Sequence, residues 1–286
     1  MYNEKKDVIV ICGPTASGKT KLGIELAKKL NGEIISADSM QIYKDMDIGT
    51  AKPTSEERLM AVHHLVDFVS PDQRYSVADF KKDAVKTIED IISRNKIPII
   101  VGGTGLYINS LIYNIDFKEE KTDLEYRKSL EEKSVQELYE NALKIDPEAL
   151  KKLSENDRKR ITRILEIYHT TGKTKTELEI ESRKEVPYNY HIFVLSMDRE
   201  ILYDRINRRV DMMLEQGLIE EVQKVIRKYN YFPTAMQGLG YKEVVEYLEN
   251  KLTKEEMIEK IKQESRRYAK RQLTWFRAYK QAVWLD

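Results

Sequence analysis

The chain has 286 residues, 41% of them hydrophobic, so it can form one large domain or a core with a substantial insertion. Its 49 Lys and Arg residues nearly cancel its 48 Asp and Glu residues, so the net charge of +1 neither indicates nor excludes a nucleic-acid partner. The single Cys12, the polar start from Met1 to Lys6 and the lack of an apolar stretch near the roughly 20 residues of a membrane span predict a cytoplasmic protein with no membrane contact.

The first part of the chain alternates strands with helices. Largely apolar, β-branched runs predict strands at residues 7–12, 33–38 and 97–101. Residues 21–30 and 78–93 instead have apolar side chains at helical spacing. Apolar strands that alternate with helices indicate an α/β fold, with a parallel sheet flanked by helices on both faces.

Residues 116–185 differ in composition from the segment before them. They are rich in Lys, Glu and Arg, have leucines at helical spacing and contain no convincing strand. A further strand and four helices are predicted after them, at residues 191–197, 199–215, 217–229, 240–250 and 254–280. The sequence therefore predicts a catalytic core of residues 1–115 and 190–286, interrupted by an all-helical insertion domain at 116–189.

A phosphate-binding pattern follows the first predicted strand. The chain matches G-x-x-x-x-G-K-[ST] at Gly13, Pro14, Thr15, Ala16, Ser17, Gly18, Lys19 and Thr20. Backbone N–H groups and the start of the next helix would form a hollow for an anion, to which Lys19 adds a positive charge. The Thr20 hydroxyl is a candidate Mg²⁺ ligand. The segment predicts a P-loop NTPase-like site that binds a di- or triphosphate.

Two neighbouring features narrow the reaction. The strand at 97–101 is followed by Gly102-Gly103-Thr104 and lacks the Asp of a Walker B strand, which is atypical of motor ATPases and GTPases. The strand at 33–38 ends in Asp38, and ligands of parallel sheets collect at the carboxyl ends of the strands. Asp38 is therefore a candidate general base, with a helix cap or an indirect Mg²⁺ ligand as the alternative roles.

Beyond the P-loop, the chain resembles the tRNA dimethylallyltransferases, also called tRNA isopentenyltransferases. The most specific match is the block from Ser36 to Pro53, which includes Asp38, Ser39, Met40 and Gln41. Other matching segments are His63–Asp67, Tyr75–Phe80, Val101–Tyr107, Asn156–Arg163, Arg205–Met213 and Gln237–Lys242. The resemblance extends over nearly the whole chain.

This resemblance implies transfer of a dimethylallyl group from dimethylallyl diphosphate to N6 of adenosine 37, beside the anticodon of tRNAs that read U-starting codons. The P-loop would hold the diphosphate leaving group with Mg²⁺ as cofactor, and Lys19 would stabilise its developing charge. Thr15 would contact the breaking bond, and Asp38 would accept the amine proton. An arginine near residue 205 would also bind the diphosphate; Arg205 and Arg209 are both candidates, and Arg205 is favoured.

The anticodon stem-loop would need contacts of its own, because a base must leave its stack to reach a buried carboxylate. Candidate contacts, from the resemblance and from the basic groups at 158–163 and 266–271, are Asp38, Ser39, Met40, Gln41, Thr104, Arg127, Arg160, Arg163, Arg267 and Arg271. Gln41 carries an amide that could pair with the adenine edge, and Thr104 could instead cap the next helix. A monomer is expected.

Two other enzyme classes use the same residues. In a P-loop kinase of small metabolites, Asp38 would deprotonate a hydroxyl, but the basic insertion would have no role. A prenyltransferase acting on free adenylate would share the chemistry without the tRNA. A nucleotide-switched RNA-binding protein is the non-enzymatic alternative, and the missing Walker B Asp speaks against it.

Overall fold

The computed structural model describes residues 5–117, 123–151, 153–182 and 184–286. Residues 1–4, part of the polar start on which the prediction of a cytoplasmic protein partly rests, lie outside the described residues. The chain divides into two compact units, one formed by Met1–Ile112 and Pro187–Asp286 and the other by Tyr113–Val186. The second unit corresponds to the insertion expected at 116–189, with both boundaries three residues earlier.

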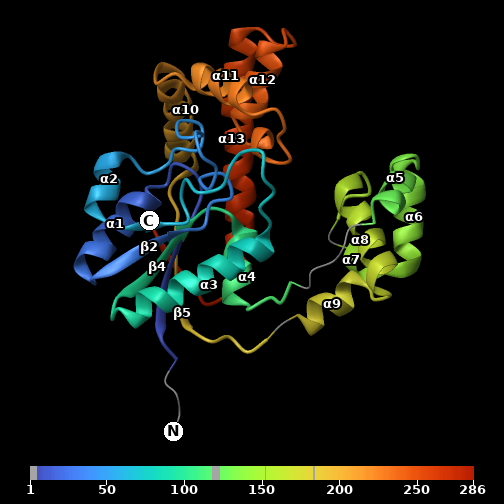
Figure 1. Ribbon diagram of the computed structural model, residues 1–286, viewed down its shortest axis with the longest axis horizontal. Helices are drawn as coiled ribbons and strands as arrows, with labels where there is room; N and C mark the ends of the chain where they lie inside the picture. Colours follow the sequence, from blue (N-terminus) through green and yellow to red (C-terminus); the bar gives the residue numbers. More distant parts are fainter. Residues whose placement is uncertain (1–4, 118–122, 152, 183) are drawn as a thin grey trace. The chain divides into compact units, whose positions relative to one another are not determined.

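The larger unit contains a six-stranded parallel sheet with the strand order β3-β2-β4-β1-β5-β6 (Figure 1). Its strands are β1 (Asp7–Cys12), β2 (Gly32–Ser36), β3 (His63–His64), β4 (Ile97–Gly102), β5 (Asn189–Leu195) and β6 (Val283–Leu285). The four strands expected from the sequence are confirmed. The sequence analysis missed β3 and β6, which are short strands at the two edges of the sheet.

Helices of the larger unit follow the expected order, with two additions. They are α1 (Lys19–Lys29), α2 (Ser55–Met60), α3 (Val77–Ser93), α4 (Gly105–Ile112), α10 (Arg199–Glu215), α11 (Leu218–Lys228), α12 (Tyr241–Leu248) and α13 (Lys254–Phe276), with a 3₁₀ turn at η1 (Ala235–Gln237). α2 and α4 had not been predicted. α13 starts at a capping box, in which the Thr253 hydroxyl accepts from the N–H of Glu256 and the Glu256 carboxylate accepts from the N–H of Thr253. No helix of the described chain combines the length and the apolar character needed to cross a membrane.

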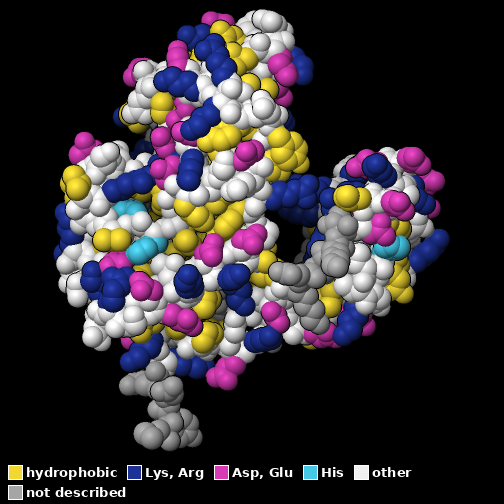
Figure 2. Space-filling model, in the orientation of Figure 1, with side chains coloured by type: hydrophobic (Ala, Val, Ile, Leu, Met, Phe, Trp, Pro, Cys, Tyr) yellow, Lys and Arg dark blue, Asp and Glu magenta, His cyan; other side chains and the backbone are white. Residues whose placement is uncertain are grey.

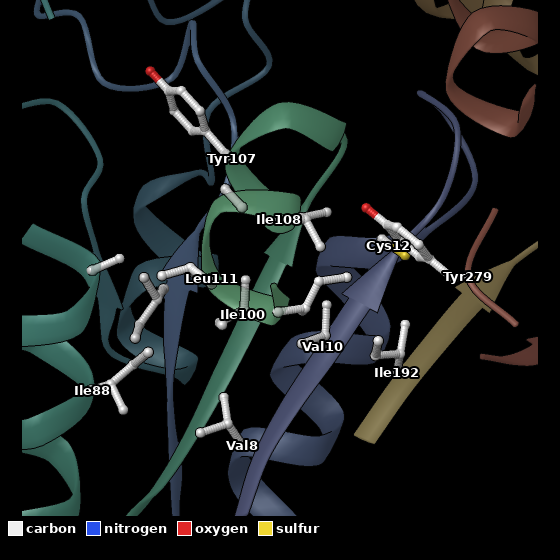
Figure 3. Packing of buried hydrophobic residues seen from close by; sticks show 14 of the residues in the cluster. Val8, Val10, Cys12, Ile88, Ile100, Tyr107, Ile108, Leu111, Ile192 and Tyr279 are labelled. Carbon is white, nitrogen blue, oxygen red and sulfur yellow. The ribbon is translucent and has the colours of Figure 1, made fainter. Parts of the chain in front are cut away.

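Both faces of the sheet are buried, because successive residues of β1 point to opposite sides. Val8, Val10 and Cys12 pack in a cluster with α3, α4 and the C-terminal end of α13 (Figure 3). Ile11 packs on the other face with α1. Helices therefore cover the sheet on both sides, as predicted. Burial raises the pKa of the Cys12 thiol to about 12, so this side chain belongs to the core.

A second hydrophobic cluster joins α10–α13 to the loop that follows β2. Tyr43 and Met46 of that loop and Tyr241 of α12 are among its fully buried side chains. The buried Glu221 carboxylate of α11 accepts hydrogen bonds from the Tyr241 hydroxyl and from the backbone N–H groups of residues 47–49, at 2.5 to 3.1 Å. The loop is thus fixed by helices far away in the sequence.

In the described residues of the smaller unit, all elements of regular secondary structure are helices. These are α5 (Leu124–Glu131), α6 (Val135–Ile145), α7 (Pro147–Leu150), α8 (Arg158–Thr171) and α9 (Lys175–Glu181). Its core contains Leu138 of α6 with Ile161 and Ile164 of α8, all fully buried. The predicted helical insertion is confirmed for these residues.

Candidate active site

The loops after β1, β2 and β4 meet at one end of the sheet. Because β4 lies between β1 and β2, the P-loop, the Gly102–Thr104 turn and Asp38 occupy adjacent strand ends. They line a cavity of about 620 Å³, together with residues from α10, α12 and α13. Thr15, Lys19 and Asp38 therefore share one cavity, which is the juxtaposition expected from the sequence.

The P-loop leaves β1 at a crowded point. Gly13 has a φ of 151°, and a Cβ atom on it would lie only 2.8 Å from the carbonyl oxygen of Leu195. The Ser17 hydroxyl is buried and has no hydrogen-bond partner in the described structure. Gly18, with a φ of 92°, then precedes the first turn of α1. A tightly packed loop, an unpaired buried hydroxyl and a helix N-terminus together suit an anionic ligand.

Two cationic side chains border the cavity next to this loop. Lys19 Nζ donates a hydrogen bond to the carbonyl of Pro14 at 2.6 Å. Burial lowers the pKa of Lys19 to about 8; nearby Arg209 adds to this shift, and Asp38 opposes it. Burial likewise lowers the pKa of Arg209, again opposed by Asp38. Both cations have lowered pKa values, and a bound anion would stabilise their charged forms.

We expect the affinity for inorganic pyrophosphate to fall as pH rises through about 8, the depressed pKa of Lys19 in the free protein. Above this pH part of the Lys19 population is neutral, whereas the bound anion favours the ammonium form, so binding takes up a proton. Calorimetric titrations between pH ~7 and ~9 would measure the effect. Lys19→Arg is the control: its side chain stays charged over this range, so any pH dependence that remains comes from the titration of pyrophosphate itself. An identical pH dependence in both proteins would contradict the assignment.

The structure favours Arg209 over Arg205 as the diphosphate-binding arginine. Arg209 lines the cavity with Lys19 and Asp38. Arg205 is exposed and lines a neighbouring pocket of about 850 Å³. The two side chains share one side of α10 but differ in height along its axis by four residues, about 6 Å. Ala16 and Thr20 of the P-loop also line the neighbouring pocket. Arg209 lines both pockets, whereas Arg205 lines only the neighbouring one.

Asp38 is held by a turn of the backbone. Its Oδ1 atom accepts hydrogen bonds from the N–H groups of Met40 at 2.8 Å and Gln41 at 3.3 Å. Both bonds reach the same oxygen, so Oδ2 is the atom available to a ligand. Residues 39–42 form turns, so Asp38 does not cap a helix. Burial raises the pKa of the nearby Tyr268 to about 12, and the charge of Asp38 adds to that shift.

Thr104 braces the same turn. Its hydroxyl accepts a hydrogen bond from the N–H of Ser39 at 3.0 Å and donates one to the Ser39 hydroxyl at 3.3 Å. Its own N–H donates to the carbonyl of Ala37 at 3.1 Å. The Thr104 side chain, predicted to contact tRNA or to cap a helix, therefore ties the end of β4 to the end of β2.

The Gln41 amide is engaged within the protein. Its Nε2 atom donates to the carbonyls of Thr50 at 3.3 Å and Ala51 at 2.9 Å, and its Oε1 atom accepts from the Ser36 hydroxyl at 3.0 Å. Gln41 itself lines the cavity, and its pairing with an adenine edge stays a prediction. Gln41 also orders the segment at 50–51, which lines the cavity.

The arginines of the insertion that were predicted to contact tRNA differ in their ion pairs and in their exposure to solvent. Arg127 forms two hydrogen bonds with the buried Glu166 carboxylate, from Nε at 2.5 Å and Nη2 at 3.0 Å, and Arg163 lies 3.6 Å from the same group. Arg127, predicted to contact tRNA, therefore neutralises a buried charge within the insertion. Arg160 is 65% exposed and lies 3.5 Å from Asp157, so it is the most open of the three.

The two arginines expected to bind tRNA from α13 differ in position. Arg267 is exposed and pairs with Glu264 at 2.6 Å. Arg271 is exposed, lies over the Tyr268 ring and lines the mouth of the cavity. On the face shown in Figure 2, Lys and Arg side chains are mixed with Asp and Glu side chains. The described residues of this face form no continuous basic surface, so Arg271 would contribute to RNA binding through its own position at the cavity.

The sequence analysis missed a whole wall of the cavity. Ser265, Tyr268 and Gln272 project from one side of α13 and line it. Their spacing of three and four residues is a signal for a shared helix face. In the sequence, the basic group at 266–271 conceals this face, because it favours a tRNA-binding surface.

The residues present fit the expected Mg²⁺. Among the described residues no group of three His, Cys, Asp or Glu side chains could hold a metal ion. Thr20, in the first turn of α1, lines the cavity with the P-loop. Mg²⁺ commonly binds one or two protein oxygens and completes its shell with phosphate oxygens and water. A Thr20 hydroxyl beside a diphosphate site matches that pattern.

Several known proteins of similar sequence have the same name. The chain matches the family models described as IPP transferase, over residues 41–279, and isopentenyl transferase, over residues 6–65. The tRNA dimethylallyltransferase of Acetivibrio thermocellus is 52% identical, covering 98% of this chain and 91% of that protein. Its counterpart in Anoxybacillus flavithermus is 51% identical, covering 98% and 90%.

Solved structures agree with this result. The full-length tRNA isopentenylpyrophosphate transferase of Bacillus halodurans has a TM-score of 0.74 at 45% identity, covering 99% of this chain and 90% of that chain. A eukaryotic dimethylallyltransferase acting on tRNA has a TM-score of 0.84 at 36% identity, covering 98% and 74%. The chain therefore belongs to the tRNA dimethylallyltransferase family, as its sequence blocks indicated, and has the P-loop-like fold of these enzymes.

Proposed function

We propose that the protein transfers a dimethylallyl group from dimethylallyl diphosphate to N6 of adenosine 37 in tRNAs that read U-starting codons. Family membership supports this activity over the metabolite kinase and the free-adenylate prenyltransferase. The observation that carries the mechanism is the single cavity shared by the P-loop, Arg209 and Asp38. The enzyme acts in this proposal as a cytoplasmic monomer.

The donor's diphosphate would lie against the P-loop. Lys19 and Arg209 supply positive charge there, and the start of α1 supplies backbone N–H groups. These groups are fixed before the reaction, so they stabilise the charge that develops on the leaving group without reorganising. Mg²⁺, held by the Thr20 hydroxyl, would add further neutralisation when bound.

The acceptor amine would approach from the side of Asp38. N6 of the adenine attacks C1 of the prenyl chain; the C–N bond forms as the C1–O bond breaks, and pyrophosphate leaves with the electron pair. Asp38 Oδ2 takes the amine proton as the new bond advances. Because Oδ1 is already held by two N–H groups, the carboxylate needs no further ordering to receive it.

Label transfer separates this function from its alternatives. The protein is incubated with labelled dimethylallyl diphosphate, Mg²⁺ and unmodified tRNA, and the product is digested and analysed by mass spectrometry. Acid-stable label on adenosine 37 is expected, and the same tRNA with guanosine at that position should remain unlabelled. Label on free AMP but not on tRNA, or ATP-dependent phosphorylation of a metabolite, would support an alternative enzyme.

We also expect tRNA binding to weaken steeply with salt, because phosphate contacts release condensed counterions. Arg271→Ala should reduce the slope of log affinity against log salt by about one. Arg227→Ala, which removes another exposed charge, from α11, is the matched control. Fluorescence anisotropy with labelled tRNA measures both slopes. A flat salt response of the wild-type protein would argue against phosphate contacts.

A further inference from the structure

Gln272 of α13 connects two loops of the active site. Its side chain is buried, with an exposed fraction of 5%. Its Oε1 atom accepts a hydrogen bond from the backbone N–H of Thr15 in the P-loop at 2.9 Å. Its Nε2 atom donates to the carbonyl of Gly103, after β4, at 2.9 Å. One buried amide thus uses its acceptor on one loop and its donor on another.

The amide is also in close contact with the β4 turn. A Cβ atom on Gly103 would lie 2.2 Å from Gln272 Nε2, so any other residue there would displace the amide. Thr104, the next residue, holds the turn of Asp38 through its bonds to Ser39. A continuous path of hydrogen bonds and covalent bonds therefore leads from the P-loop to the proposed base.

The chemistry of this bridge requires an amide. A glutamine offers one acceptor and one donor at the end of its side chain. Glutamate would keep the acceptor for Thr15 but oppose the Gly103 carbonyl with a second oxygen. Methionine has a similar length but neither an amide oxygen nor an N–H donor, so it would break both bonds. Asparagine is one methylene shorter and could not span both loops.

We propose that Gln272 is a positioning residue for prenyl transfer, which holds Thr15 in the cavity and sets the P-loop relative to Asp38. This inference rests on the proposed function. Thr15 lines the cavity where the breaking C1–O bond would lie. A displacement of about 1 Å in such a group can cost on the order of 10²-fold in rate. Both ends of the Gln272 amide are engaged by backbone groups of Thr15 and Gly103, so in this proposal it acts through Thr15.

A double-mutant cycle tests whether Gln272 acts through Thr15. Gln272→Met should lower kcat by about 10- to 100-fold. Thr15→Val removes the hydroxyl that Gln272 positions, so adding Gln272→Met to it should lower kcat by less than about threefold more. Gln263→Met, on an exposed position of the same helix, should match the wild-type protein. Effects that multiply in the double variant, or an unchanged kcat in Gln272→Met, would overturn the proposal.

Two further measurements distinguish a failure of this proposal from a failure of the variant to fold and from a failure of the proposed function. If Gln272→Met does not fold, Gln272→Glu replaces it in the cycle. Its carboxylate loses the bond to Gly103 and repels that carbonyl, so kcat should fall, and should fall by less when Thr15→Val is already present. If the wild-type protein labels no tRNA, the proposed function fails. The bridge is then tested by calorimetry with inorganic pyrophosphate, where Gln272→Met should bind several-fold more weakly than Gln263→Met. Equal affinities would overturn the bridge as well.

Discussion

Replacement of Asp38 by Asn is expected to lower the rate of prenyl transfer by about 10²- to 10⁴-fold, the usual contribution of a general base. Asn has the same size, and its Oδ1 atom can still accept from the N–H groups of Met40 and Gln41. The turn should therefore persist while the proton acceptor is lost. Single-turnover reactions with labelled dimethylallyl diphosphate and saturating tRNA isolate the chemical step.

Two comparisons make this result specific. Pyrophosphate affinity, measured by calorimetry, should be largely retained in Asp38→Asn, because the cations of the P-loop remain. Asp72→Asn is the matched control, since Asp72 is exposed and lies outside the cavity. A near-normal transfer rate in Asp38→Asn would refute the general-base role and leave Asp38 with a function in ordering the turn.

The features that the sequence predicted well are those that local pattern determines. The P-loop is a contiguous segment between a strand and a helix, and continuous apolar runs mark the four central strands. Asp38 followed from the same reasoning, because strand ends of a parallel sheet share one edge. The edge strands β3 and β6 have two and three residues, too few to show a period.

The assignments that local pattern left undecided depend on tertiary position. Arg205 and Arg209 are equivalent by helical spacing. They differ only in their position along α10 relative to the P-loop cavity. Gln41 and Arg127 carry the right groups for RNA, but Gln41 is held by its own loop, and Arg127 by Glu166, 39 residues away. Gln272 lies 257 residues from Thr15, and no local pattern could connect them.

Replacement of Arg209 by Ala should weaken pyrophosphate binding by about 10- to 100-fold, because hydrogen bonds between charged groups contribute about 1.5–3 kcal/mol. Arg205→Ala, one turn away on the same helix, should change the affinity by less than about threefold, as expected for an exposed charge. Calorimetry measures the pyrophosphate affinities of both variants, and so compares the same substitution at two positions along α10. A larger loss for Arg205→Ala would restore the preference drawn from the sequence.

The same variant has a second consequence that a mere loss of contact would not produce. Arg209 contributes to the lowered pKa of Lys19, after burial. Without this neighbouring charge, the Lys19 ammonium is less costly to keep in the cavity, so its pKa in the free protein should rise. The pH at which pyrophosphate affinity falls should then move above about 8 in Arg209→Ala and stay in place in Arg205→Ala. An unmoved midpoint in Arg209→Ala would show that the two cations do not interact across the cavity.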